Sequence, residues 1–154
     1  MNEFMQAAID EAVAGIDGNE GGPFGAVVVR NGVILGRGHN RVITTNDPTA
    51  HAEVNAIREA ASFLNRYDLS DCEIYTTCEP CPMCYGAIHW ARIGTIHRGA
   101  TKEDAAAIGF NDLDIYEDIA KAPAEREIIM DEVDREACLS VFRRWHAKDD
   151  RVLY

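Results

Sequence analysis

The sequence predicts an α/β fold, specifically a three-layer α/β/α sandwich with a central mixed sheet, formed as one domain by residues 1–154. Three observations predict this fold. A hairpin signal lies near the N-terminus, helical and β-rich segments alternate after it, and a hydrophobic content of 47% is enough for a sizeable core. The strand, helix, strand order predicts parallel neighbours with a right-handed crossover, to which the hairpin adds an antiparallel pair.

Local signals place the individual elements. Asn31-Gly32 separates two β-rich runs, and Asn-Gly in that position is typical of a two-residue hairpin turn. Asp47 and Pro48 predict the start of a helix, and apolar residues then recur at helical spacing. The expected elements are helix 3–15, strands 25–30 and 33–37, helix 50–64, strand 72–77, helix 81–91, strand 95–99, helix 115–120, strand 127–130 and helix 135–147.

Two short segments carry the chemistry. The first is His51-Ala52-Glu53, and the second runs from Pro80 to Cys84. His51, Cys81 and Cys84 supply three zinc ligands, and the two cysteines at i and i+3 share one face of a helix. A catalytic zinc keeps three protein ligands and leaves the fourth position to water, so the pattern predicts one catalytic Zn²⁺ per subunit.

Glu53 distinguishes a catalytic zinc site from a structural one. Zinc lowers the pKa of bound water toward about 7, but hydrolysis of an amine also needs a group that moves protons. The pair of segments, H-x-E with P-C-x-x-C, is the signature of zinc deaminases, in which the glutamate has that role. The alternative is a closed structural site in which Cys78 is the fourth ligand and Glu53 is merely solvated.

Composition restricts the partners. Fifteen basic and 26 acidic residues give a formal net charge of -11, which repels nucleic acid. No segment approaches about 18 continuous apolar residues, so no membrane span is expected. The N-terminus lacks the features of a signal peptide, and five cysteines, an odd number, fit a reducing cytoplasm better than a disulfide framework. We therefore expect a cytoplasmic enzyme that acts on a small molecule.

Four stretches make the resemblance more specific. GGPFGAVVV, NDPTAHAEVNAIR, CEPCPMCYGAIHWAR and AIGFND, with the terminal Tyr154, resemble the bacterial guanine deaminases of the cytidine deaminase superfamily. The resemblance implies a cytidine deaminase-like fold and zinc-dependent hydrolysis of guanine to xanthine and ammonia. It also implies a homodimer, with the C-terminal segment, about 100–154, exchanged between subunits. The positions that carry over are His51, Cys81 and Cys84 as zinc ligands, Glu53 as proton shuttle, Asn40 and Asp112 as guanine contacts, and Phe24, Trp90 and Tyr154 as aromatic contacts.

Physical chemistry makes the Asp112 assignment reasonable. Guanine presents N1–H and its 2-amino group as adjacent donors, and a carboxylate accepts both, whereas adenine offers no such pair. The chain departs from the family pattern at Asn111, where an aspartate is usual. Glu79, Glu132 and Glu136 are further acidic candidates for proton transfer, and the sequence does not choose among them.

Other functions remain open at this level. Close alternatives are a guanosine deaminase and a relaxed guanine or aminotriazine (ammeline) deaminase, which differ in the room around the ring. The tRNA adenosine deaminases share the zinc motif but would need a basic surface. A non-catalytic module stabilised by zinc is the alternative from another class.

Overall fold

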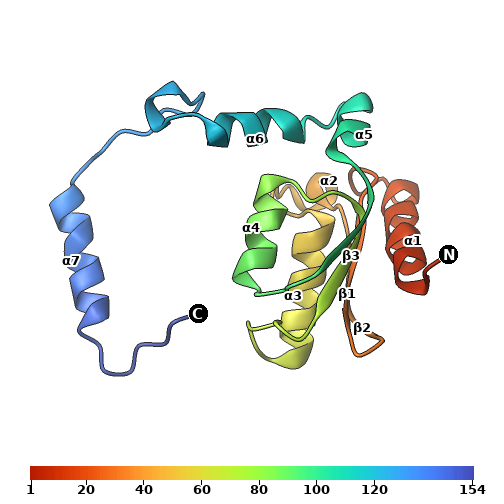
Figure 1. The fold of residues 1–154 in the computed structure, drawn as a ribbon, viewed down its shortest axis with the longest axis horizontal. Coiled ribbons are helices and arrows are strands. Elements are labelled where there is room, and N and C mark those ends of the chain that lie inside the picture. Colours follow the sequence, from red (N-terminus) through yellow and green to blue (C-terminus); the bar gives the residue numbers. More distant parts are fainter. The chain divides into compact units, whose positions relative to one another are not determined.

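The computed structural model describes residues 1–154, which divide into two units, Met1–Tyr116 and Glu117–Tyr154. The first unit contains a four-stranded sheet in the order β2-β1-β3-β4 (Figure 1). Strand β1 is antiparallel to β2 and β3, whereas β3 and β4 are parallel. The mixed sheet expected from the sequence is therefore confirmed. Its strands are β1 (Gly25–Arg30), β2 (Val33–His39), β3 (Glu73–Cys78) and β4 (Ile96–Ala100).

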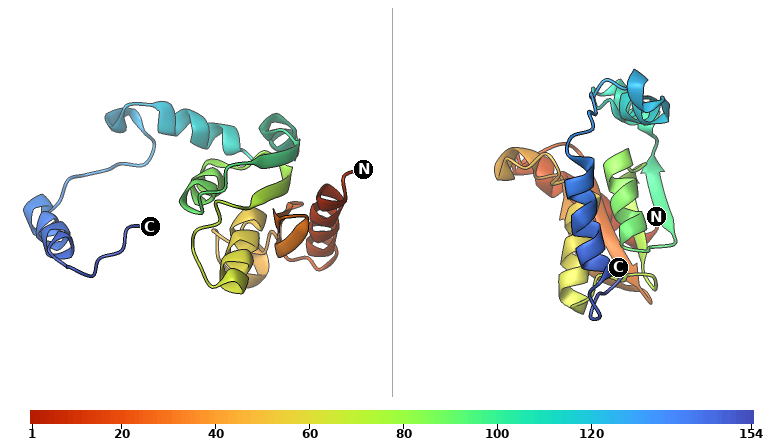
Figure 2. Two further views of the ribbon diagram at one scale, coloured as in Figure 1. Left: turned by 60° about the horizontal axis from the view of Figure 1, so that its bottom comes forward. Right: turned by 90° about the vertical axis from the view of Figure 1, so that its left-hand side faces the viewer.

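Helices cover both faces of this sheet. Helix α1 (Glu3–Asp17) packs on one face, while α3 (Ala52–Leu64) and α4 (Pro82–Trp90) lie on the other (Figure 2). These layers confirm the three-layer sandwich. Two short helices in the first unit, α2 (Val42–Thr45) and α5 (Lys102–Ala107), were not predicted, because each is too short to show a clear apolar repeat.

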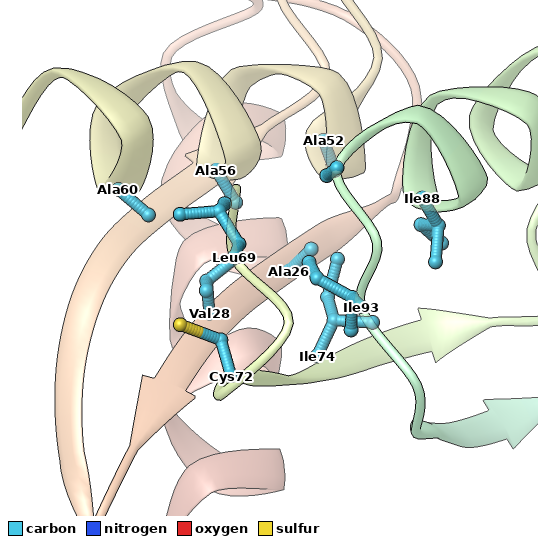
Figure 3. Close-up of a cluster of buried hydrophobic side chains, with 11 residues drawn as sticks. Ala26, Val28, Ala52, Ala56, Ala60, Leu69, Cys72, Ile74, Ile88 and Ile93 are labelled. Atoms are coloured by element: carbon cyan, nitrogen blue, oxygen red, sulfur yellow. The ribbon is translucent and has the colours of Figure 1, made fainter. Parts of the chain in front are cut away.

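The core lies on both sides of β1. Ala26 and Val28 pack with α3 and α4 (Figure 3), whereas Val27 and Val29 pack with α1. Successive side chains of a strand point to opposite faces, so a strand covered on both sides must be apolar at every position. The uninterrupted apolar run of β1 therefore places it at the centre of the sheet.

The hairpin between β1 and β2 has the expected turn. Asn31 and Gly32 both have positive φ, 50° and 75°, as a type I′ turn requires. Strand β2 continues to His39, two residues beyond its predicted end. This extension brings the chain directly to Asn40, one of the predicted site residues.

Two glycines of β2 allow α3 to pack closely on the sheet. A Cβ atom at Gly38 would lie 2.4 Å from the carbonyl oxygen of Ala52, and one at Gly36 would lie 2.2 Å from that of Ala56. Both distances are far below van der Waals contact, so only glycine permits this helix position.

The C-terminal part is helical but has no buried core of its own. Helix α6 (Asp112–Ala120) starts in the first unit, and η1 (Pro123–Glu125) and α7 (Arg135–His146) follow in the second. The strand predicted over 127–130 is wrong, because no strand forms there and its apolar side chains are exposed. Helix α6 also begins three residues before its predicted start at Ile115. No helix of the chain is long and apolar enough to span a membrane.

Candidate active site

Two helix N-termini converge at the predicted metal site. His51 is the N-cap residue of α3 and Cys81 is the N-cap residue of α4, and neither side chain makes a cap hydrogen bond. The predicted helix start at Ala50 is therefore two residues early. Asp47 does not cap α3 either, because its carboxylate accepts from the backbone N–H and the hydroxyl of Thr49 at 2.8 and 2.7 Å. The imidazole and the thiol are thus left available for each other.

The distances within the cluster fit a tetrahedral zinc ion. Nδ1 of His51 lies 3.6 Å from Sγ of Cys81 and 3.5 Å from Sγ of Cys84, and all three ligand atoms lie within 4.8 Å of one another. Zinc bonds to sulfur and nitrogen, meeting at a tetrahedral angle, place those two atoms about 3.6 Å apart. The residues therefore have both the chemistry and the spacing to bind zinc.

Hydrogen bonding within the cluster favours a thiolate. The pKa of Cys81 is lowered because the Cys84 thiol and the His51 ring hydrogen-bond to its sulfur. The same contact with Cys81 raises the pKa of Cys84, and that of His51 is raised by its bond to Cys81. Thiolate is the form of cysteine that binds metal, and Cys81 is the group that these hydrogen bonds favour as a thiolate.

Cys78 does not join this cluster. Its thiol donates to the carbonyl oxygen of Thr101 at 3.4 Å, and burial raises its pKa to about 11. The metal-binding group contains His51, Cys81 and Cys84 alone. The closed four-ligand site thus lacks its fourth protein ligand, and the arrangement matches the open coordination of a catalytic zinc.

Glu53 lies in the first turn of α3 and is 6% exposed. The hydroxyl of Thr76, on β3, donates to Oε1 of Glu53 at 3.3 Å. Burial raises the pKa of Glu53, and a raised pKa makes a carboxyl a better proton acceptor. Thr76 was not identified from the sequence, since nothing in a strand residue marks it as a neighbour of a distant helix.

A cavity of about 430 Å³ opens at the metal cluster. It is bordered by the loop before β1, the segment after β2, the starts of α3 and α4, and the segment that leads into α6. It brings together most of the predicted residues. Those that line it are Phe24, Asn40, His51, Glu53, Cys81 and Asp112.

Asn40 is held rigidly in the wall of this cavity. It is 4% exposed, its backbone N–H donates to the carbonyl of Phe24 at 3.1 Å, and its Oδ1 accepts from the backbone N–H of Val42 at 3.2 Å. With the oxygen engaged, the side-chain NH₂ group is the donor that Asn40 offers to a substrate.

Asp112 is the first residue of α6 and presents a carboxylate to the cavity. Its pKa is raised, mainly by burial and secondarily by the negative charge of Cys81, while the charge of His51 lowers it. Asp112 is thus close enough to feel the charges of Cys81 and His51, and it lines the same cavity.

The aromatic residues divide into two groups. Phe24 packs edge to face against Phe110, with ring centroids 4.8 Å apart and an interplanar angle of 85°, and both rings line the cavity. Trp90, by contrast, ends α4 and is 68% exposed, about 14 Å along the helix from Cys81. The first unit therefore pairs Phe24 with Phe110 and not with Trp90. Tyr154 lies in the second unit, and its role stays a prediction.

Phe110 was missed by the sequence analysis. It lies in the stretch AIGFND, two residues before the predicted guanine contact Asp112, and that proximity was the one available signal.

The remaining acidic candidates differ in position. Glu79 lines the cavity, but its carboxylate lies 3.2 Å from Nζ of Lys102 and 3.8 Å from Nε of Arg98. Glu79 is thus paired with both cations. Glu132 and Glu136 belong to the second unit. The side chain of Asn111 donates to the carboxylate of Asp114.

Three side chains able to bind zinc, a buried carboxylate and an adjoining cavity on an α/β/α sandwich are the features of a zinc hydrolase. Residues 1–100 match the sequence profile of the cytidine and deoxycytidylate deaminase zinc-binding region. The chain belongs to this family of zinc deaminases.

Proteins of similar sequence match different shares of this chain. It is 49% identical over 142 residues to guanine deaminase of Bacillus subtilis (strain 168), across 92% of this chain and 91% of that protein. The X-ray structure of guanine deaminase from Bacillus subtilis matches with a TM-score of 0.95 and 47% identity, and covers 100% of this chain and 99% of that one. A tRNA-specific adenosine deaminase of Buchnera aphidicola is 51% identical over 78 residues, only 51% of this chain and 48% of that protein. Similarity to guanine deaminase thus includes the C-terminal part of the chain.

Proposed function

We propose that this protein is a zinc-dependent aminohydrolase that converts guanine to xanthine and ammonia. The observation that carries the proposal is the position of Asp112, a partly buried carboxylate in the same cavity as the three metal ligands and Glu53. Similarity to a guanine deaminase along nearly the whole chain supports the choice of substrate.

The metal ligands and Glu53 divide the work of hydrolysis. His51, Cys81 and Cys84 would hold one zinc ion, which supplies Lewis acidity and a nucleophilic water at neutral pH. Glu53 would accept one proton from the attacking water and deliver it to the ring nitrogen next to the carbon that bears the amino group. It would then take the proton of the hydroxyl added to that carbon and give it to the amino group, so that the carbon–nitrogen bond breaks, the carbonyl forms and ammonia leaves. Burial of Glu53 supports this role, because it favours a carboxyl that exchanges protons readily.

Three other residues select and orient the base. The carboxylate of Asp112 accepts from N1–H and from the 2-amino group, while the NH₂ group of Asn40 donates to a ring acceptor. Phe24 provides an aromatic surface for the flat purine. Adenine would leave the carboxylate without its two donors, and a buried charge without partners is costly.

The acidic character of the chain favours a free base over a tRNA. A formal net charge of -11 repels a polyanion, and similarity to the tRNA deaminase covers only about half of the chain. Guanosine and ammeline remain the competing small substrates.

We also propose a cytoplasmic homodimer in which the C-terminal segment is exchanged and Tyr154 completes the partner's site. Val141, Phe142 and Trp145 form one apolar face of α7 and are exposed, so this face needs a partner surface. All five cysteines are free thiols, which suits a reducing compartment.

A substrate panel tests the function. Purified protein with measured zinc content is incubated with guanine, guanosine, cytosine, cytidine, adenine or ammeline, and ammonia release is recorded. We expect about one zinc per chain and the highest kcat/KM with guanine. A higher value for guanosine or ammeline would assign the substrate to that compound, whereas bound zinc without turnover of any compound would indicate a non-catalytic module.

A further inference from the structure

Tyr116 connects the substrate-recognition helix to the metal-binding turn. It lies on α6, and its hydroxyl donates to the backbone carbonyl oxygen of Pro80 at 2.8 Å. Pro80 directly precedes Cys81, the N-cap residue of α4 and a metal ligand. Asp112 and Tyr116 are spaced i and i+4 on α6, so their side chains share one face of the helix. The anchored face is therefore the face that carries the recognition carboxylate.

We infer that Tyr116 is a positioning residue, which sets the distance between Asp112 and the metal cluster through its hydrogen bond to Pro80. This inference deepens the proposed function and rests on it. Tyr116 does not line the cavity, so it acts on the substrate only through Asp112.

Helix α6 has few other attachments. None of its residues is buried, and hydrophobic packing therefore contributes little to its position. Because hydrophobic packing is weak here, the hydrogen bond from Tyr116 to Pro80 has a large influence on the position of the start of α6.

The surroundings of the ring stabilise this contact. Nζ of Lys102, on α5, lies 5.2 Å from the ring centroid of Tyr116 and 3.2 Å from the Glu79 carboxylate, which belongs to the same turn as Pro80. Burial raises the pKa of Tyr116, so its hydroxyl stays protonated and remains a donor. Helix α5, helix α6 and the turn before Cys81 thus meet at one ring.

The substitution Tyr116→Phe removes the hydroxyl and keeps the ring. A net hydrogen bond of ordinary strength corresponds to a loss of roughly 3- to 10-fold, and we expect this as a higher KM for guanine with a nearly unchanged kcat and zinc content. Tyr67→Phe is the matched control, because Tyr67 lies outside the cavity near Arg92 and its loss should leave KM unchanged.

A double-mutant cycle tests whether Tyr116 acts through Asp112. If it does, Tyr116→Phe should lower kcat/KM in the wild type but have little further effect in an Asp112→Asn background. Equal effects in both backgrounds would overturn the positioning role, and so would an unchanged KM in the single variant.

Hydrogen exchange separates this inference from the proposed function. Backbone amides over 112–120 should exchange faster in Tyr116→Phe than in the wild type or in Tyr67→Phe, whichever base proves to be the substrate. Unchanged exchange would overturn the anchor. A wild type that is inactive on guanine, but whose α6 loosens in Tyr116→Phe, would overturn the proposed substrate and leave the anchor in place.

Discussion

The hydroxyl of Thr76 lies 3.3 Å from the carboxylate of Glu53 and 3.0 Å from the carbonyl oxygen of Cys78. Its single proton thus has two acceptors. When Glu53 is ionised, Thr76 donates to it, and when Glu53 is protonated, the hydroxyl donates to the carbonyl and accepts from the acid. Strand β3 therefore provides a partner for both protonation states of the proposed proton shuttle.

Glu53→Gln should separate metal binding from catalysis. The amide has the size of the carboxylate but does not carry protons, so we expect turnover to fall by about 10²- to 10⁴-fold, while zinc content stays at the wild-type level. Metal analysis and ammonia release on the same sample measure both quantities. Near-normal turnover would rule out Glu53 as the shuttle.

The cysteines make a matched pair of variants. Cys81→Ser removes a ligand and should lose most of the zinc together with the activity. Cys78→Ser should retain both, because the serine hydroxyl still donates to the carbonyl of Thr101. Zinc content per chain is the measurement. Loss of zinc from the Cys78→Ser protein would support the closed structural site in which Cys78 is the fourth ligand.

Asp112→Asn should weaken recognition of guanine. The NH₂ group of the amide would face the two N–H donors of guanine and leave them without an acceptor. Unpaired donors of this kind cost about 1–3 kcal/mol of binding free energy, or roughly 5- to 150-fold in kcat/KM. Asp114→Asn, on the same helix, is the control, since that carboxylate bonds to Asn111 and does not line the cavity. If both variants lost activity equally, the effect would belong to the helix and not to the carboxylate.

Asp68 should make stability depend on pH in the acid range. The pKa of Asp68 is lowered to about 2 from 3.8 by hydrogen bonds to its carboxylate from the Ser70 hydroxyl, from the Ser70 backbone N–H at 3.0 Å and from the Arg92 guanidinium at 2.7 Å. Because the unfolded chain binds this proton more readily, the stabilisation is complete above about pH 4 and is lost as the pH falls toward 2. Asp68→Asn should lower Tm at neutral pH, with a difference that narrows on acidification. A constant difference would refute this linkage.

Phe142→Asp should disrupt the proposed dimer. The substitution puts a charge into the apolar face of α7, which is exposed in the isolated chain and would be buried against the partner. Sedimentation analysis is expected to give a dimer for the wild type and a monomer for the variant. Glu136→Gln on the same helix serves as control, and a dimeric Phe142→Asp protein would exclude α7 from the interface.

Local signals predicted most of the first unit. Asn31-Gly32 predicted the hairpin, and the i, i+3 spacing of Cys81 and Cys84 predicted that they share one helix face, because both patterns depend on neighbours in the chain. The meeting of these cysteines with the distant His51 was predicted from the motif formed by the two segments together. The pairing of Phe24 with Phe110 was not accessible, since it depends on how two distant loops meet. The strand predicted over 127–130 failed for a related reason. A β-rich run needs a neighbouring strand, and the sequence does not supply one.

Gly38 in β2 determines how closely the start of α3, which carries the catalytic residues, lies against the sheet. Since a Cβ atom at Gly38 would collide with Ala52, next to both His51 and Glu53, adding a single methyl group there would displace a metal ligand and the proton shuttle at once. Substitution of Gly38, which lies on the opposite side of α3 from the substrate, should therefore reduce activity more than substitution of many larger residues that line the cavity. Substitutions meant to fit the cavity to another base should therefore be tolerated at the cavity rim but not at Gly38 in β2.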